Sequence, residues 1–127
     1  MFRLTTWFLI LGTVLAVLHA TALTLYLYSF YWWFDVVMHL LGGAVVVLGL
    51  GALGDLGRIR AERWLAPLPA FGLLVFVMVV WEAFEYVVRV TRAEHFVLDT
   101  VSDLIFGFIG GVIGLFIARQ FLLTSRS

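Results

Sequence analysis

Seven ionisable residues lie inside long apolar stretches of this sequence. A charged side chain in such a stretch costs about 2.5–3.5 kcal/mol on membrane-insertion scales, so each one is a candidate functional residue. Six of them form pairs whose members are three or four residues apart, which places both members of a pair on one face of a helix. The seven residues are His19, Asp35, His39, Glu82, Glu85, Asp99 and Asp103.

The side chains of this set favour metal chemistry. Several carboxylates in one region of low dielectric cannot all stay ionised without protons, a paired histidinium or a bound cation. Imidazole and carboxylate groups on facing helices suit a divalent transition metal such as Zn, Fe or Mn. Because a metal lowers the pKa of bound water to about 7, metal-assisted hydrolysis or transfer on a lipid-linked or envelope substrate is the most natural activity. The chain contains no cysteine, which excludes thiolate ligands and disulfides.

We expect the residues to divide into two roles. The expected direct metal ligands are Glu82, Asp103, His39 and His19. The expected supporting groups, or ligands of a second metal, are Asp35, Glu85 and Asp99. Glu82 and Asp103 are the hardest to explain otherwise, because neither a helix cap nor an interface accounts for them.

Simpler roles stay open for the others. His19 could make a single hydrogen bond between helices. Glu85 could pair with Arg89 at the membrane interface. Asp35 and Asp99 could cap the N-termini of their helices.

Four apolar segments must position these residues. The 127 residues are 64% hydrophobic and 13% charged, whereas soluble domains average about 45–50% and 25%. The segments cover about residues 4–28, 32–53, 65–88 and 96–121, and each reaches the roughly 20 residues that cross a bilayer. A closed barrel needs more chain than this. We therefore expect an all-α fold with a single transmembrane domain over residues 1–127, an up-down four-helix bundle.

Arginine placement predicts the orientation of the bundle. Arg3, the arginines of the 54–64 connection and those near the C-terminus fall on one side, and Arg89 and Arg92 on the other. The positive-inside rule then puts both termini in the cytoplasm. With a rise of 1.5 Å per residue, the expected direct ligands lie roughly 9–14 Å from the outer ends of the helices and the supporting groups roughly 4–6 Å. The scattered residues thus form two layers in the outer leaflet.

The first segment has a competing interpretation. Arg3, the following apolar run and an Ala-Thr-Ala sequence at residues 20–22 are also typical of a signal peptide with its cleavage site. The apolar character continues beyond Ala22 to Tyr28, which favours a retained helix.

Glycines follow the ionisable residues along two segments. Gly42 and Gly43 come after His39, and Gly107, Gly110, Gly111 and Gly114 come after Asp103. Small residues allow helices to approach closely in lipid, so we expect tight packing next to the polar layers. A lipid or ligand tail lying against a groove is the alternative.

Three short motifs resemble the VanZ-like superfamily, including the YjdF-type small inner-membrane proteins. They are Asp35-x3-His39 followed by glycines, Trp81-Glu82-x2-Glu85, and Asp99-Thr100-x2-Asp103 running into glycines. The resemblance implies a small multi-pass protein of a bacterial or archaeal cytoplasmic (inner) membrane. Some members confer resistance to the glycopeptide teicoplanin and others have no assigned activity, so the resemblance implies no mechanism.

Other functions are compatible with the same residues. Histidine and carboxylate chains inside membranes also mark ion paths, so a proton relay or transporter is one alternative. His19 and His39 at matching depth could ligate a b-type haem in a non-catalytic subunit of a larger membrane complex. The formal net charge of zero gives no reason to expect a nucleic acid partner. Membrane lipid is the expected partner, and the size is compatible with a homo-oligomer.

Overall fold

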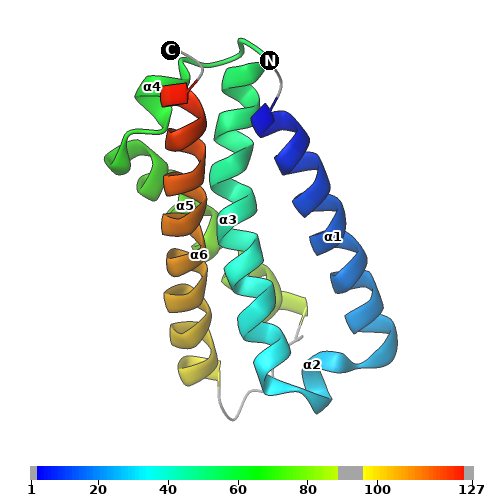
Figure 1. Cartoon of the computed structure of the whole chain (residues 1–127). Helices are drawn as coiled ribbons and strands as arrows, with labels where there is room; N and C mark the ends of the chain where they lie inside the picture. Colours follow the sequence, from blue (N-terminus) through cyan, green and yellow to red (C-terminus); the bar gives the residue numbers. More distant parts are fainter. Residues whose placement is uncertain (1–2, 89–95, 125–127) are drawn as a thin grey trace.

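The computed structural model describes residues 3–88 and 96–124, and these form helices without any strand (Figure 1). The helices are α1 (Arg3–Leu25), α2 (Leu27–Phe30), α3 (Trp32–Asp55), α4 (Ala61–Trp64), α5 (Pro67–Val88) and α6 (Phe96–Thr124). In the described part, α1, α3, α5 and α6 are long and apolar enough to cross a membrane. The prediction of an all-helical four-helix membrane bundle is confirmed.

The helix ends differ from the predicted spans in a few places. The first span does not run to Tyr28, because Tyr26 has a φ of 56° and this left-handed conformation ends α1 at Leu25. The short helix α2 then turns the chain toward α3. At their C-terminal ends, α3 and α6 run two or three residues beyond the predicted spans. Helix α5 begins at Pro67, where the missing proline N–H costs no hydrogen bond.

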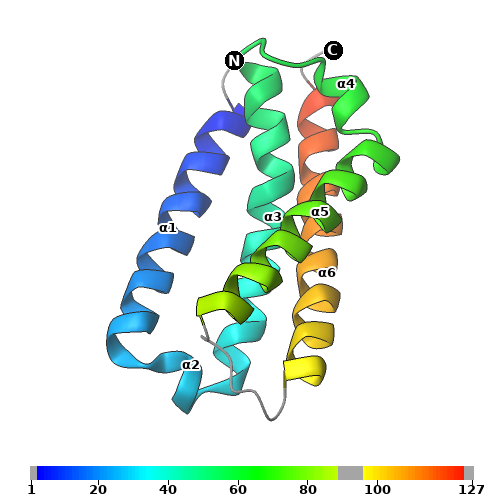
Figure 2. The ribbon, with the colours of Figure 1, turned by 180° about the vertical axis from the view of Figure 1, so that it is seen from behind.

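Helices α3 and α6 form the closest pair in the bundle. They lie side by side and run in the same direction in both views of the ribbon (Figures 1 and 2). A side chain at Gly43 would collide with the carbonyl of Gly107, and one at Gly110 with the carbonyl of Leu40. The two backbones are therefore in direct contact, as the glycine pattern predicts.

Helix α1 packs against α3, and its buried residues lie near its two ends. At its start, the Thr5 backbone N–H and hydroxyl both donate to Oδ2 of Asp55, at 3.0 and 3.4 Å. Leu4 and Ala22 are its only buried residues in the described part. The rest of α1 presents apolar side chains to the surroundings, which fits a helix whose solvent is lipid.

The apolar core lies toward the end of the bundle that carries both termini. Its centre is formed by Leu48 of α3, Leu65, Ala70 of α5 and Leu115 of α6, together with Leu4 of α1. A smaller cluster of Ala22, Phe34 and Met38 lies toward the α2 end. The ionisable residues of α3 lie at the level of this smaller cluster, since Asp35 and His39 directly follow Phe34 and Met38.

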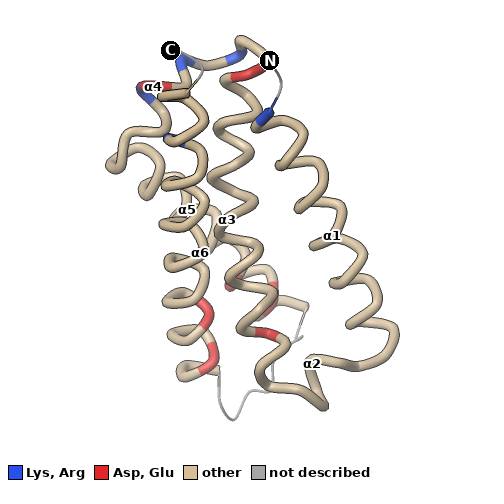
Figure 3. Tube along the Cα trace, in the orientation of Figure 1, with Lys and Arg blue, Asp and Glu red and all other residues tan. Residues whose placement is uncertain are grey.

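Charged residues of the described part separate along the bundle axis (Figure 3). The arginines lie at the end that carries both termini, where they are joined by Asp55 and Glu62. The remaining acidic residues lie in the half of the bundle next to α2. The structure thus shows both termini on one side, and the assignment of that side to the cytoplasm stays a prediction from the arginine distribution.

Candidate metal site

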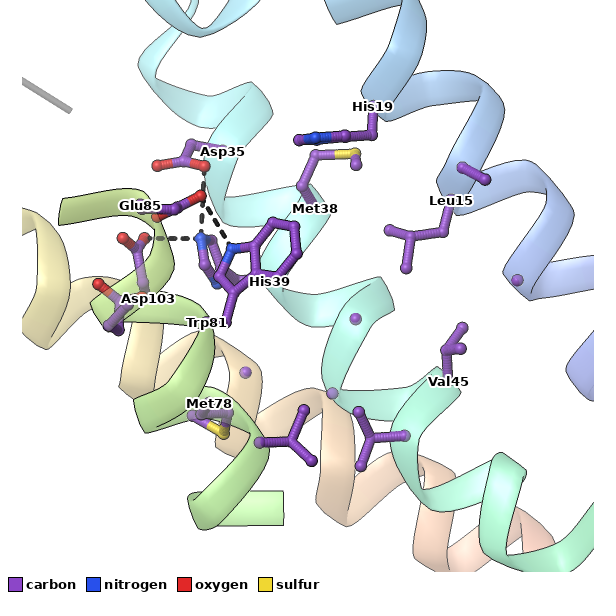
Figure 4. Close-up of a pocket in the computed structure, with 18 of the residues that line it drawn as sticks. Leu15, His19, Asp35, Met38, His39, Val45, Met78, Trp81, Glu85 and Asp103 are labelled. Atoms are coloured by element: carbon purple, nitrogen blue, oxygen red, sulfur yellow. Dashed lines mark hydrogen bonds and ion pairs between the residues drawn. The ribbon is translucent and has the colours of Figure 1, made fainter. Parts of the chain in front are cut away.

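The contact between α3 and α6 brings His39 next to Asp103. Gly43 and Gly107 touch, and His39 and Asp103 lie four residues before them on parallel helices, so the two side chains share one level. Nε2 of His39 lies 3.6 Å from Oδ1 of Asp103 and 3.4 Å from Oδ1 of Asp35 (Figure 4). His39 is therefore bracketed by a carboxylate on its own helix and one on α6.

Helix α5 contributes two more carboxylates to this level. Glu82 and Glu85 are both buried, with 7% and 6% of their surface exposed. The indole Nε1 of Trp81 donates to Oε1 of Glu85 at 2.8 Å, which orients that carboxylate (Figure 4). Because Trp81 and Glu85 are one helical turn apart, α5 holds this bond without help from other elements.

The potential ligand atoms converge into two overlapping groups. The first comprises His39, Glu82, Glu85 and Asp103, and the second comprises Asp35, Asp99 and Asp103. Within each group, one ligand atom per residue lies within 4.8 Å of all the others. Asp103 belongs to both groups, and it is the most deeply buried of the carboxylates, with 2% exposed.

Two carboxylate oxygens in the site are unsatisfied. Oε2 of Glu82 and Oδ2 of Asp103 are fully buried and have no hydrogen-bond partner within the described part of the chain. A buried polar atom without a partner costs about 1–3 kcal/mol, and more when it is charged. Such atoms need a role that offsets this cost, and ligation of a cation is one.

His19 is not brought into either group. Its Nδ1 lies 2.8 Å from the hydroxyl of Tyr28, and its ring packs edge-on against Trp81 with centroids 5.7 Å apart. It faces the same cavity as the carboxylates from the side of α1 (Figure 4). Sequence reasoning missed the contact of Tyr28 with His19, because that contact depends on the turn at Tyr26.

Asp35 and Asp99, which were considered as helix caps, both lie inside their helices. Asp35 lies inside the first turn of α3, whose N-cap is Tyr31, so it is not the cap of that helix. Asp99 likewise lies inside α6, three residues after Phe96. The suggested partner of Glu85, Arg89, lies outside the described residues, as does Arg92.

A cavity of about 320 Å³ adjoins the cluster. Its polar end is formed by residues of the cluster and by His19, and its remaining walls are mainly apolar side chains and glycines from α1, α3, α5 and α6. Small-molecule sites are typically about 300–1,000 Å³, mostly apolar with a few convergent polar groups. The cavity therefore has the size and lining of a ligand site.

Comparison with known proteins assigns the family. The family model described as "Predicted membrane protein (DUF2238)" matches residues 1–123. The chain belongs to this family. No curated protein and no solved structure matches it significantly.

Membership of DUF2238 agrees with the four candidate spans, and the match covers all of them except the last residue of α6. It supports a membrane protein family without reaching the VanZ-like superfamily that the motifs resemble. The chemistry of the cluster must therefore be argued from its geometry.

Proposed function

We propose that this DUF2238 protein binds a divalent transition metal, such as Zn, Fe or Mn, within the membrane. The ligands are His39, Glu82, Glu85 and Asp103, and Asp35 and Asp99 either support them or hold a second ion next to Asp103. The observation that carries the proposal is the convergence of these buried groups from three helices, with Glu82 Oε2 and Asp103 Oδ2 unsatisfied.

The spacing of the donor atoms supports this proposal. Metal–ligand distances of about 2.0–2.2 Å place neighbouring ligand atoms of a tetrahedral site about 3.4 Å apart. The separation between Nε2 of His39 and Oδ1 of Asp103, 3.6 Å, is close to that value. The nitrogen–oxygen pair at 3.6 Å is too long for a good hydrogen bond.

The negative charge of the cluster also supports a bound cation. Buried ions carry a penalty of several kcal/mol each unless an opposite charge compensates them. In the described part, the arginines lie at the other end of the bundle, and His19 bonds to Tyr28, so His39 is the basic side chain that pairs with the acidic groups. A divalent cation supplies the missing positive charge.

Metal-assisted hydrolysis or transfer on a lipid-linked or envelope substrate is the activity we propose for the site. A bound divalent cation supplies Lewis-acid chemistry there. Trp81 fixes one oxygen of Glu85, which orients that carboxylate toward the cluster. The site would open to the outer leaflet of a bacterial or archaeal cytoplasmic membrane, in keeping with the resemblance to VanZ-like proteins.

A proton relay or transporter is less well supported by the same structure. The apolar core around Leu48 and Leu115 separates the cluster from Asp55 at the other end of the bundle. Within the described residues, no chain of hydrogen-bonded side chains crosses that core. A path through one copy of the protein would therefore end in the middle of the membrane.

Elemental analysis of the detergent-purified protein, before and after titration with Zn²⁺, Mn²⁺ and Fe²⁺, tests the proposal. We expect stoichiometric metal in the unaltered protein and its loss in an E82Q/D103N double variant. E62Q is the matched control, because Glu62 is an exposed carboxylate on α4. Unaltered protein that neither retains nor binds metal would refute the proposal, and a Soret absorption band would favour a haem subunit instead.

A further inference from the structure

We infer that the cavity beside the cluster holds one apolar chain of a membrane lipid or lipid-linked molecule, with the polar end of that molecule at the cluster. The polar end of this inference rests on the proposed function, because a bound cation attracts the oxygen atoms of a head group, whereas ionised carboxylates offer only acceptors. The position of the apolar lipid chain rests on the cavity alone.

The lining of the cavity divides into a polar end and an apolar end. His39, Glu85 and Asp103 lie at one end, with His19 facing them (Figure 4). The apolar remainder is lined by residues of three helices, namely Gly12, Leu15, Ala16, Val45, Val46 and Val77. This is the polarity of an amphiphile, with a head at one end and a hydrocarbon tail at the other.

The depth of the apolar end of the cavity matches one leaflet. Gly12, Val45 and Val77 lie 11–13 residues from the ends of their helices next to α2, which is about 16–20 Å at 1.5 Å per residue. Half of the hydrocarbon core of a bilayer is about 15 Å. The apolar end therefore reaches the middle of the membrane, and the polar end lies toward the head groups on the α2 side. A lipid of that leaflet enters the cavity without turning over.

Helix α1 offers the route from the bilayer. Between its buried residues Leu4 and Ala22, the side that faces the cavity is only partly covered, and Ala16 is exposed. The cavity is partly open. Because lipid surrounds the spans and the opening is apolar, a hydrocarbon chain is the occupant that the surroundings supply.

Two glycines provide a matched test of this inference. A Cβ added at Gly42, which lines the cavity, would meet no atom within 4 Å, so G42L is the substitution chosen to fill the cavity. Gly72 on α5 has the same freedom and lies outside the cavity, so G72L is the control. A second pair on α1, A16F in the cavity wall and A20F outside it, serves if G42L does not fold.

The probe is a phosphatidylglycerol with a diazirine at the end of one acyl chain, in phosphatidylcholine vesicles that contain the metal-loaded protein. After irradiation, peptide mapping should show labelling at cavity residues such as Leu15 and Val45 above that at the exposed Val14. G42L or A16F should lower the cavity labelling about tenfold, since excluding a couple of methylene groups costs that much affinity. G72L and A20F should leave it unchanged.

The outcomes separate the two proposals. Cavity labelling that equals labelling at Val14 and is insensitive to G42L and A16F overturns the inference, even if the protein carries its metal. Cavity labelling that is lost in G42L and A16F supports binding of a lipid chain in the cavity. If the protein then proves to bind no metal, the proposed function is refuted, but the inferred binding site for the lipid chain is not.

Discussion

Nε2 of His39 and Oδ1 of Asp103 lie 3.6 Å apart because the helices that carry them touch one turn further along, at Gly43 and Gly107. The glycines are therefore part of the site although they offer no ligand. A helix pair that could not approach this closely would hold the histidine and the carboxylate too far apart to share a cation.

A G43A substitution should destabilise the protein and remove its metal together. The added Cβ would collide with the carbonyl of Gly107, and overpacking of this kind typically costs about 1–3 kcal/mol. Thermal unfolding in detergent and elemental analysis measure the two effects. G72A is the control, since a Cβ there meets open space and should stabilise the helix by about 0.5–1 kcal/mol. Equal stability of G43A and the unaltered protein would contradict the proposed contact.

An E82M substitution should stabilise the protein in the presence of a chelator while it lowers metal content. Glu82 buries an unsatisfied oxygen that is useful only with a cation bound, and its replacement by an apolar side chain of similar size removes a cost of about 1–3 kcal/mol. Chemical unfolding with and without chelator measures the difference. The exposed E62M control should change stability by less than about 0.5 kcal/mol. If E82M is instead less stable under chelation, Glu82 has a structural role.

A W81F substitution should weaken metal binding without removing it. The change keeps one aromatic ring next to His19 and Phe84, makes the side chain smaller and deletes the N–H that orients Glu85. Loss of such an orienting hydrogen bond typically lowers metal affinity about 10–100-fold. Competition with a chromophoric chelator measures the affinity. W33F is the control because Trp33 is exposed and does not line the cavity, and an equal effect in both variants would count against the role of Trp81.

An H19Q substitution should retain metal, whereas H39Q should lose it. His39 faces two carboxylates, while Nδ1 of His19 is held by Tyr28 on the opposite wall of the cavity. Elemental analysis of the two purified variants, side by side, decides between them. Loss of metal in both variants would show that His19 is a ligand, as the depth expected for it in the membrane predicts.

Much of the site could be predicted from residue spacing along each helix. The rise per residue places Asp35 and His39, or Glu82 and Glu85, at known depths and on one face each. The arginine positions and the span lengths then predict the direction in which each helix crosses the membrane. These properties are local, so the sequence reveals them without knowledge of packing.

The sequence by itself determined the spans, the acidic half of the bundle and the glycines that permit close approach. Only the tertiary structure decided which side chains meet: Asp103 shared between two groups of ligands, Trp81 holding Glu85, and His19 turned to Tyr28. The physical reason is that every span is apolar on most of its surface. In lipid, hydrophobicity does not dictate which face turns inward, so the rotation and tilt of each helix follow from backbone contacts such as Gly43 with Gly107.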